Sequence, residues 1–96
     1  MKKIIKFQTG ELVTTARLAK SCEQEPKFNE QVLHSYMRYV KNDWGEMSVE
    51  DKQMNDDAVL NNNDRIFAAY ETIKGKIYII TEADRSYTTI LFANEY

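Results

Sequence analysis

Few side chains in this 96-residue sequence are of the types that carry out catalysis. His34 is the only histidine, and it is expected one helical turn before Arg38, so its neighbour is a cation and not the carboxylate that orients a catalytic histidine. Cys22 is the only cysteine and belongs to an apolar helical stripe, where cysteine usually acts as a small core residue. The motifs CxxC, HExxH, GxGxxG and the P-loop are absent. We therefore predict that the protein is not an enzyme and holds no cofactor.

Carboxylates are concentrated in one short stretch. Residues 43–57 contain six acidic side chains against a single lysine, Lys52. The six are Asp43, Glu46, Glu50, Asp51, Asp56 and Asp57, called the acidic segment below. Calcium-binding loops alternate their acids around a glycine, and this spacing does not match, so no metal site is predicted. The acidic segment is predicted to be either a solvated helix face or a patch that meets a basic partner.

A basic strip is expected on another helix. His34, Arg38 and Lys41 are spaced four and three apart, which places them on one helix face. The two interpretations of this strip are a plain solvent-facing surface and a contact for RNA.

Loop residues form a third candidate group. They are Trp44, Glu82, Asp84 and Arg85. Charged residues in a loop beside a hairpin are potential recognition groups. The alternative is that Asp84 closes a turn, Arg85 pairs with a neighbour and Trp44 folds back onto the core.

The periodicity of apolar residues predicts the elements that position these groups. Spacings of three and four favour helices over residues 15–24, 27–41 and 49–60, and β-branched and aromatic runs favour strands over 65–71, 76–81 and 87–92. The predicted fold class is α+β, with N-terminal helices packed on a C-terminal three-stranded antiparallel meander in a single domain, residues 1–96. Lys2 to Phe7 and Glu11 to Thr15 are candidates for an N-terminal strand that extends the sheet.

The predicted helices differ in their apolar faces. The helix over 27–41 has a broad face that is expected to cover the sheet, made by Phe28, Val32, Leu33, Tyr36, Met37 and Val40. The apolar side of the helix over 49–60 is thinner and consists of Met47, Met54, Ala58 and Leu60. Between these helices, Gly45 is expected to supply the positive φ of a helix end.

The predicted sheet has apolar residues on both faces, which has consequences for partners. Helices cover one face, and the other needs the N-terminal arm or a second copy of the chain, so a homodimer is one predicted arrangement. No apolar run is long enough for a signal peptide or a membrane span, so the predicted location is the cytoplasm, without membrane contact.

Several strings of residues together resemble one protein family. They are Gly10-Glu-Leu-Val13, Asn42-Asp-Trp-Gly45, Glu50-Asp-Lys52 leading to Asn55-Asp56, Arg65-Ile66 with Ala68-Ala-Tyr70, Ile79-Ile-Thr-Glu-Ala-Asp-Arg-Ser86 and Thr88-Thr-Ile-Leu-Phe92. The family consists of small proteins carried on plasmids, conjugative elements and phages of Gram-positive bacteria. The chain departs from its pattern at Ala93-Asn94, where a proline usually precedes Glu95-Tyr96. The resemblance extends to mobile-element anti-CRISPR proteins directed at type II systems.

This resemblance implies a counter-defence protein that inhibits a type II CRISPR RNA-guided nuclease without catalysis, by binding the nuclease or its guide RNA. The alternative is a small dimeric structural or regulatory protein of a plasmid or phage with no defence target. A basic protein channel as target would engage Glu50, Asp51, Asp56 and Asp57. An RNA target would engage His34, Arg38 and Lys41.

Overall fold

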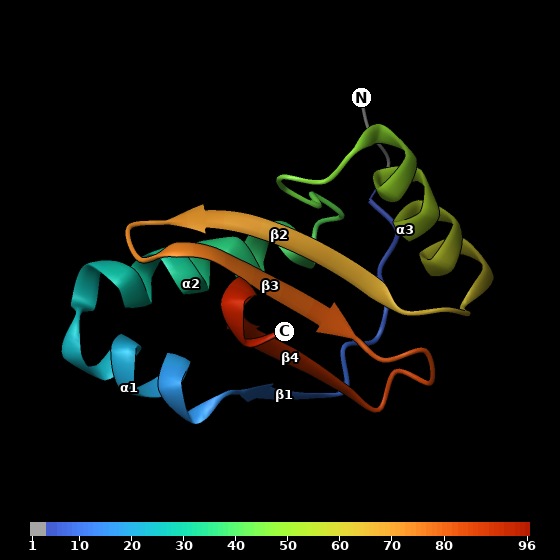
Figure 1. Ribbon diagram of the computed structural model, residues 1–96. Coiled ribbons are helices and arrows are strands. Elements are labelled where there is room, and N and C mark those ends of the chain that lie inside the picture. The colour runs from blue at the N-terminus through green and yellow to red at the C-terminus, as the bar shows by residue number, and fades with distance from the viewer. Residues whose placement is uncertain (1–3) are drawn as a thin grey trace.

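A four-stranded sheet with helices packed against it forms the centre of the protein (Figure 1). The computed structural model describes residues 4–96. Its elements are β1 Glu11–Thr14, α1 Ala16–Gln24, α2 Pro26–Tyr39, α3 Val49–Asn61, β2 Ile66–Thr72, β3 Gly75–Thr81, β4 Tyr87–Phe92 and the 3₁₀ turn η1 Ala93–Glu95. The strand order is β1-β4-β3-β2, with β1 parallel to β4 and the other neighbours antiparallel.

The α+β class and the meander β2-β3-β4 are confirmed, but the prediction of a three-stranded antiparallel sheet was wrong. β1 adds a fourth strand and makes the sheet mixed. Of the two candidate N-terminal strands, only the one at Glu11–Thr14 forms. Lys2 and Lys3 lie outside the described residues, and residues 4–7 are not in a strand. A four-residue strand leaves too short a pattern to reveal its distant parallel partner.

Capping residues set the helix ends close to their predicted positions. Thr15 accepts a hydrogen bond from the Leu18 N–H at the start of α1, and Ser48 accepts one from Asp51 at the start of α3. Pro26 occupies the first turn of α2, where a missing N–H costs nothing. The turn that follows α2 contains Asn42 in the left-handed conformation, at φ 65°. Gly45 has the predicted positive φ, at 70°, but it lies beyond the turn that ends the helix.

The helices α1 and α2 lie against one face of the sheet, and α3 lies beside the start of β2 (Figure 1). Side chains of β2, β3 and β4 that share a face by register meet these helices. They are Ile66, Ala68, Tyr70, Ile77, Ile79, Thr81, Thr88, Ile90 and Phe92, all buried. This side of the sheet holds the hydrophobic core.

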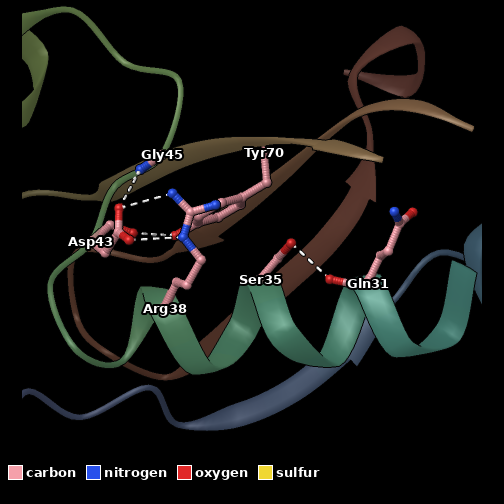
Figure 2. Close-up of polar contacts among 6 residues, drawn as sticks. All are labelled: Gln31, Ser35, Arg38, Asp43, Gly45 and Tyr70. Atoms are coloured by element: carbon pink, nitrogen blue, oxygen red, sulfur yellow. Dashed lines mark hydrogen bonds and ion pairs between the residues drawn. The ribbon is translucent and has the colours of Figure 1, made fainter. Parts of the chain in front are cut away.

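The second half of α2 meets the sheet through a different face from the one predicted. Ser35 and Tyr39 are buried, whereas Leu33 and Met37 are 56% and 55% exposed. The Ser35 hydroxyl donates to the Gln31 carbonyl at 2.8 Å, which satisfies a polar group inside the core (Figure 2). Two polar side chains with internal partners thus displace two apolar ones from the core-facing positions.

The opposite face of the sheet is partly covered by the end of the chain. Phe67 of β2, Tyr78 of β3 and Tyr96 form a ring cluster with centroids 4.7 to 5.7 Å apart. Arg65 donates to the Tyr96 hydroxyl at 2.9 Å. We predicted that the N-terminal arm or a second copy of the chain would cover this face. In the structure, C-terminal residues cover part of it.

A chain of hydroxyl groups crosses the core between α2 and the sheet. The hydroxyl oxygens of Tyr39 and Thr81 are 2.6 Å apart, those of Thr81 and Thr88 are 2.7 Å apart, and Thr88 donates to the Thr9 carbonyl at 2.6 Å. Because the one hydroxyl proton of Thr88 goes to Thr9, Thr81 donates to Thr88 and Tyr39 donates to Thr81. Burial raises the pKa of Tyr39 and of Tyr70 well above the ordinary tyrosine value.

These two tyrosines should make stability fall at alkaline pH. The unfolded chain releases their protons above about pH 10, while the folded chain retains them. Their contribution is therefore complete below about pH 10 and is lost as pH rises toward the folded pKa values. We expect the free energy of unfolding to drop by about 1.4 kcal/mol per pH unit for each tyrosine, and Tyr39→Phe to remove about half of this slope.

Urea unfolding from about pH 8 to about pH 11.5, followed by circular dichroism, measures the slope. Tyr87→Phe, which alters an exposed ring of β4, is the matched control. Equal slopes in the original protein and in Tyr39→Phe would contradict the prediction.

Candidate binding site: α3 and the cleft beside β2

Asn55 fixes α3 to the edge of the sheet. Its side-chain amide donates to the Phe67 carbonyl at 2.9 Å, and its side-chain oxygen accepts from the Phe67 N–H at 3.1 Å. These are the two backbone groups that a further strand would pair on the edge strand β2. Asn55 is itself buried, so the helix is held by a buried polar side chain whose hydrogen bonds are made.

The apolar side of α3 is not the predicted one. Ala58 is buried as expected and Val59 is buried beside it, but Met54 and Leu60 are 66% and 67% exposed. Asn55 takes a position on the buried face that the sequence pattern would give to an apolar residue. As a result, α3 presents both acidic and apolar side chains to the solvent.

The segment between α2 and α3 also attaches to β2. Trp44 is 1% exposed, and its indole N–H donates to the Asp56 carboxylate at 2.9 Å. Gly45 forms a parallel bridge with Ala69 at φ 70°, and a Cβ at Gly45 would lie 2.0 Å from the Ala69 carbonyl oxygen. The glycine is thus required for close approach to the strand. Trp44 folds onto the core, so its ring is not a surface group.

Arg85 lies inside the protein instead of on the surface of its loop. It is 6% exposed and adopts the left-handed conformation, at φ 62°. Its two terminal nitrogens donate at 2.6 to 3.2 Å to the carbonyls of Ala58, Asn63, Asp64, Glu82 and Ala83. Several of these carbonyls belong to the C-terminal end of α3 and the turn after it, where a helix carries partial negative charge. Arg85 therefore joins α3 to the β3–β4 loop.

Asp84 closes the turn next to Arg85. The Ser86 N–H donates to the Asp84 carboxylate at 2.9 Å. Hydrogen bonding from Ser86 lowers the pKa of this exposed carboxyl. Glu82 is half-buried, and its N–H donates to the Tyr87 carbonyl at 3.1 Å. Of the two predicted roles of Asp84, a recognition group and a residue that closes a turn, the structure shows the second.

The acidic segment divides into engaged and exposed carboxylates. Asp56 accepts from Trp44, and Asp43 forms an ion pair with Arg38. The remaining members are exposed, namely Glu46, Glu50, Asp51 and Asp57. Asp57 accepts from the Gln53 amide at 3.0 Å on the helix surface. The exposed carboxylates are therefore the ones placed to meet a partner.

The arginine of the basic strip is engaged within the protein. Arg38 donates through Nε and one terminal nitrogen to the two Asp43 carboxylate oxygens, at 2.7 and 3.2 Å, and its guanidinium lies 5.1 Å from the Tyr70 ring centre (Figure 2). The hydrogen bond to Asp43 raises the pKa of Arg38. The Tyr70 hydroxyl in turn donates to the Asp43 carbonyl. His34 is exposed on α2, but α2 ends at Tyr39, so Lys41 lies in the turn after the helix and the predicted strip on one helix face was wrong for Lys41.

A cleft of about 670 Å³ opens between α3 and the start of β2. Its lining residues are Met47, Asp51, Met54, Asn55, Asp57, Ala58, Asn61, Asn63, Asp64, Arg65 and Phe67. Asp51 and Asp57 were sequence candidates, whereas Asp64, Arg65 and Phe67 were missed. The signal for the missed residues was the asparagine run after α3, because a tight turn there must bring the next strand back along the helix.

Comparisons with known proteins return no relative: no protein-family model, curated protein or solved structure matches the chain. Within residues 4–96, no helix has the length and apolar character needed to cross a membrane. In the same described part, no three His, Cys, Asp or Glu residues are grouped so that they could hold a metal ion. The cleft places carboxylates beside thioether and aromatic groups, a lining that suits a ligand with both a cationic and an apolar part.

Adjacent acids of α3 should differ in their effect on folding. Asp56→Ala would leave the buried Trp44 indole N–H without its acceptor, and we expect a loss of about 1–2 kcal/mol in the free energy of unfolding. Asp57→Ala removes only an exposed contact and should cost less than about 0.5 kcal/mol. Urea unfolding followed by Trp44 fluorescence tests both variants. Equal losses would show that the acidic segment does not divide in this way.

Proposed function

We propose that this chain is a non-enzymatic counter-defence protein of a mobile element that inhibits a type II CRISPR RNA-guided nuclease by binding a basic surface of the nuclease through α3. The observation that supports a protein target is the difference between the two charged surfaces. The exposed carboxylates Glu50, Asp51 and Asp57 face solvent on α3. In the basic strip, by contrast, the Arg38 guanidinium forms an ion pair with the Asp43 carboxylate.

This difference favours the nuclease over its guide RNA as the target. RNA binding draws most of its affinity from cations that neutralise phosphates, and the Arg38 guanidinium of the strip is already paired with the Asp43 carboxylate. A basic channel draws affinity and association rate from opposing carboxylates. The counter-defence role and the nuclease rest on the sequence resemblance, and the choice of surface rests on the exposed acids.

A second candidate function is a dimeric structural or regulatory protein without a defence target. The exposed Leu33 and Met37 on α2 favour it, because they form an apolar pair one helical turn apart. The two functions require different surfaces, so variants of α3 and of α2 distinguish them.

A plasmid-interference assay tests the inhibitor function. Cells with an active type II CRISPR system receive a targeted plasmid, with and without expression of this protein. We expect the protein to restore plasmid recovery, and Asp51→Lys combined with Asp57→Lys to reduce that recovery by about tenfold or more, since two charge reversals act on one interface. Glu23→Lys on α1 is the control because it reverses an exposed acid away from α3.

Unchanged interference across several type II nucleases would contradict the inhibitor function. Loss of inhibition in Lys41→Glu, with the α3 variant unaffected, would assign the contact to the basic strip. Folding of each variant is checked by its unfolding midpoint, because exposed charges contribute little to stability.

A further inference from the structure

We propose that the cleft between α3 and β2 receives an arginine-bearing basic segment of the partner protein. This inference rests on the proposed function and names the partner's chemistry at the same site. The cleft volume of about 670 Å³ lies within the range of sites that bind specific ligands. This volume is much larger than a small ion needs, so the cleft can receive a whole side chain together with its neighbours in a peptide segment.

The lining of the cleft changes from apolar at the base to acidic at the margin. Ala58 is buried at the base, and the half-buried Phe67 and Met47 line it from β2 and from the segment before α3. The exposed Met54 adds a flexible wall, and thioether side chains adapt to varied partners. Asn55 contributes little to a ligand, because both ends of its amide are bonded to β2.

Three carboxylates border this apolar base. Asp51 and Asp57 come from α3, and Asp64 comes from the turn after it, all of them exposed. The single cation in the lining is Arg65, whose guanidinium donates to the Tyr96 hydroxyl. The balance of charge in the lining is therefore negative, which disfavours phosphate groups and favours cations.

An arginine side chain matches both parts of the cleft. Its methylene stem can pack on the methionines and Phe67, while its planar guanidinium can donate to more than one carboxylate. Aromatic rings continue the surface beyond the cleft, since Phe67 also contacts Tyr78 and Tyr96 on the outer face of the sheet. A second cation of the same segment would find ring faces there.

The test is a titration of the ¹⁵N-labelled full chain with three probes, followed by amide chemical shifts. The first probe is a capped heptapeptide in which three arginines alternate with leucines. The second has glutamates in place of the arginines, and the third is a short single-stranded RNA. We expect only the arginine peptide to shift amides of the cleft, around Met54, Ala58 and Phe67.

Variants then locate the contact. Asp51→Lys with Asp57→Lys should raise the Kd of the arginine peptide by about tenfold or more, and added salt should also raise it. Glu23→Lys should leave the Kd unchanged, and dispersed amide spectra show that each variant is folded. Equal Kd values in all variants, shifts confined to other surfaces, equal binding of the glutamate peptide, or cleft shifts caused by the RNA would each overturn the inference.

This experiment separates the inference from the proposed function. Peptide binding in the cleft without any effect on plasmid interference would support the cleft inference and contradict the inhibitor function. Inhibition of interference without peptide binding would support the inhibitor function and contradict the cleft inference.

Discussion

The arrangement of this protein depends on the hydrogen bonds between the buried Arg85 guanidinium and the backbone carbonyls around it. A buried charge without partners is costly, and among residues 4–96 no ion pair is recorded for Arg85. Five backbone carbonyls surround it instead, including that of Ala58 in the last turn of α3. The partial negative charge of the helix end and several charge-assisted hydrogen bonds together offset the cost of burial. One side chain thereby ties α3, the turn into β2 and the β3–β4 loop together.

The position of α3 determines both proposed contacts of the protein. The helix buries few apolar side chains, so Asn55 on the edge of β2, Trp44 against Asp56 and Arg85 at its end fix where it lies. With α3 held in this way, its exposed carboxylates and Met54 border one side of the cleft, and the start of β2 borders the other. A shift of the helix end would change the shape of the cleft and the direction of its acids.

Residues that carry the sequence resemblance have structural roles here. Trp44 and Gly45 attach the segment before α3 to β2, Asn55 pairs with the strand edge, and Arg85 binds the end of the helix. Trp44, Gly45, Asn55 and Arg85 therefore hold α3 and the segment before it in this arrangement on the sheet. Glu50 and Asp51, in the first turn of α3, are exposed and available to a partner.

Local signals in the sequence were sufficient for the elements but not for their faces. The strands β2, β3 and β4 begin and end within one residue of prediction because β-branched and aromatic runs are bounded by turn residues. Tyr39 and Asn55 were not included in the predicted core-facing sides of their helices, because their hydrogen-bond partners, Thr81 and Phe67, are distant in sequence. Periodicity treats such side chains as polar and assigns them to the surface.

The same limit applied to the candidate site. Arg85 was expected in a surface loop, since nothing near it in the sequence indicates that carbonyls of Ala58 in α3 and of Asn63 in the following turn will accept its hydrogen bonds. The exposed acids of α3 could be identified from charge alone. The cleft beside them could not, because four of its eleven lining residues come from the turn and the strand that follow the helix.

Amide hydrogen exchange in the variant Arg85→Met tests the central claim most directly. If Arg85 anchors α3, amides in the second half of α3 should exchange about a hundredfold faster than in the original protein, because the carbonyls around the guanidinium lose their donor. Amides of β3 should lose much less protection, since the strand remains paired with β2 and β4. Unchanged protection in α3, or an equal loss in α3 and β3, would contradict the account.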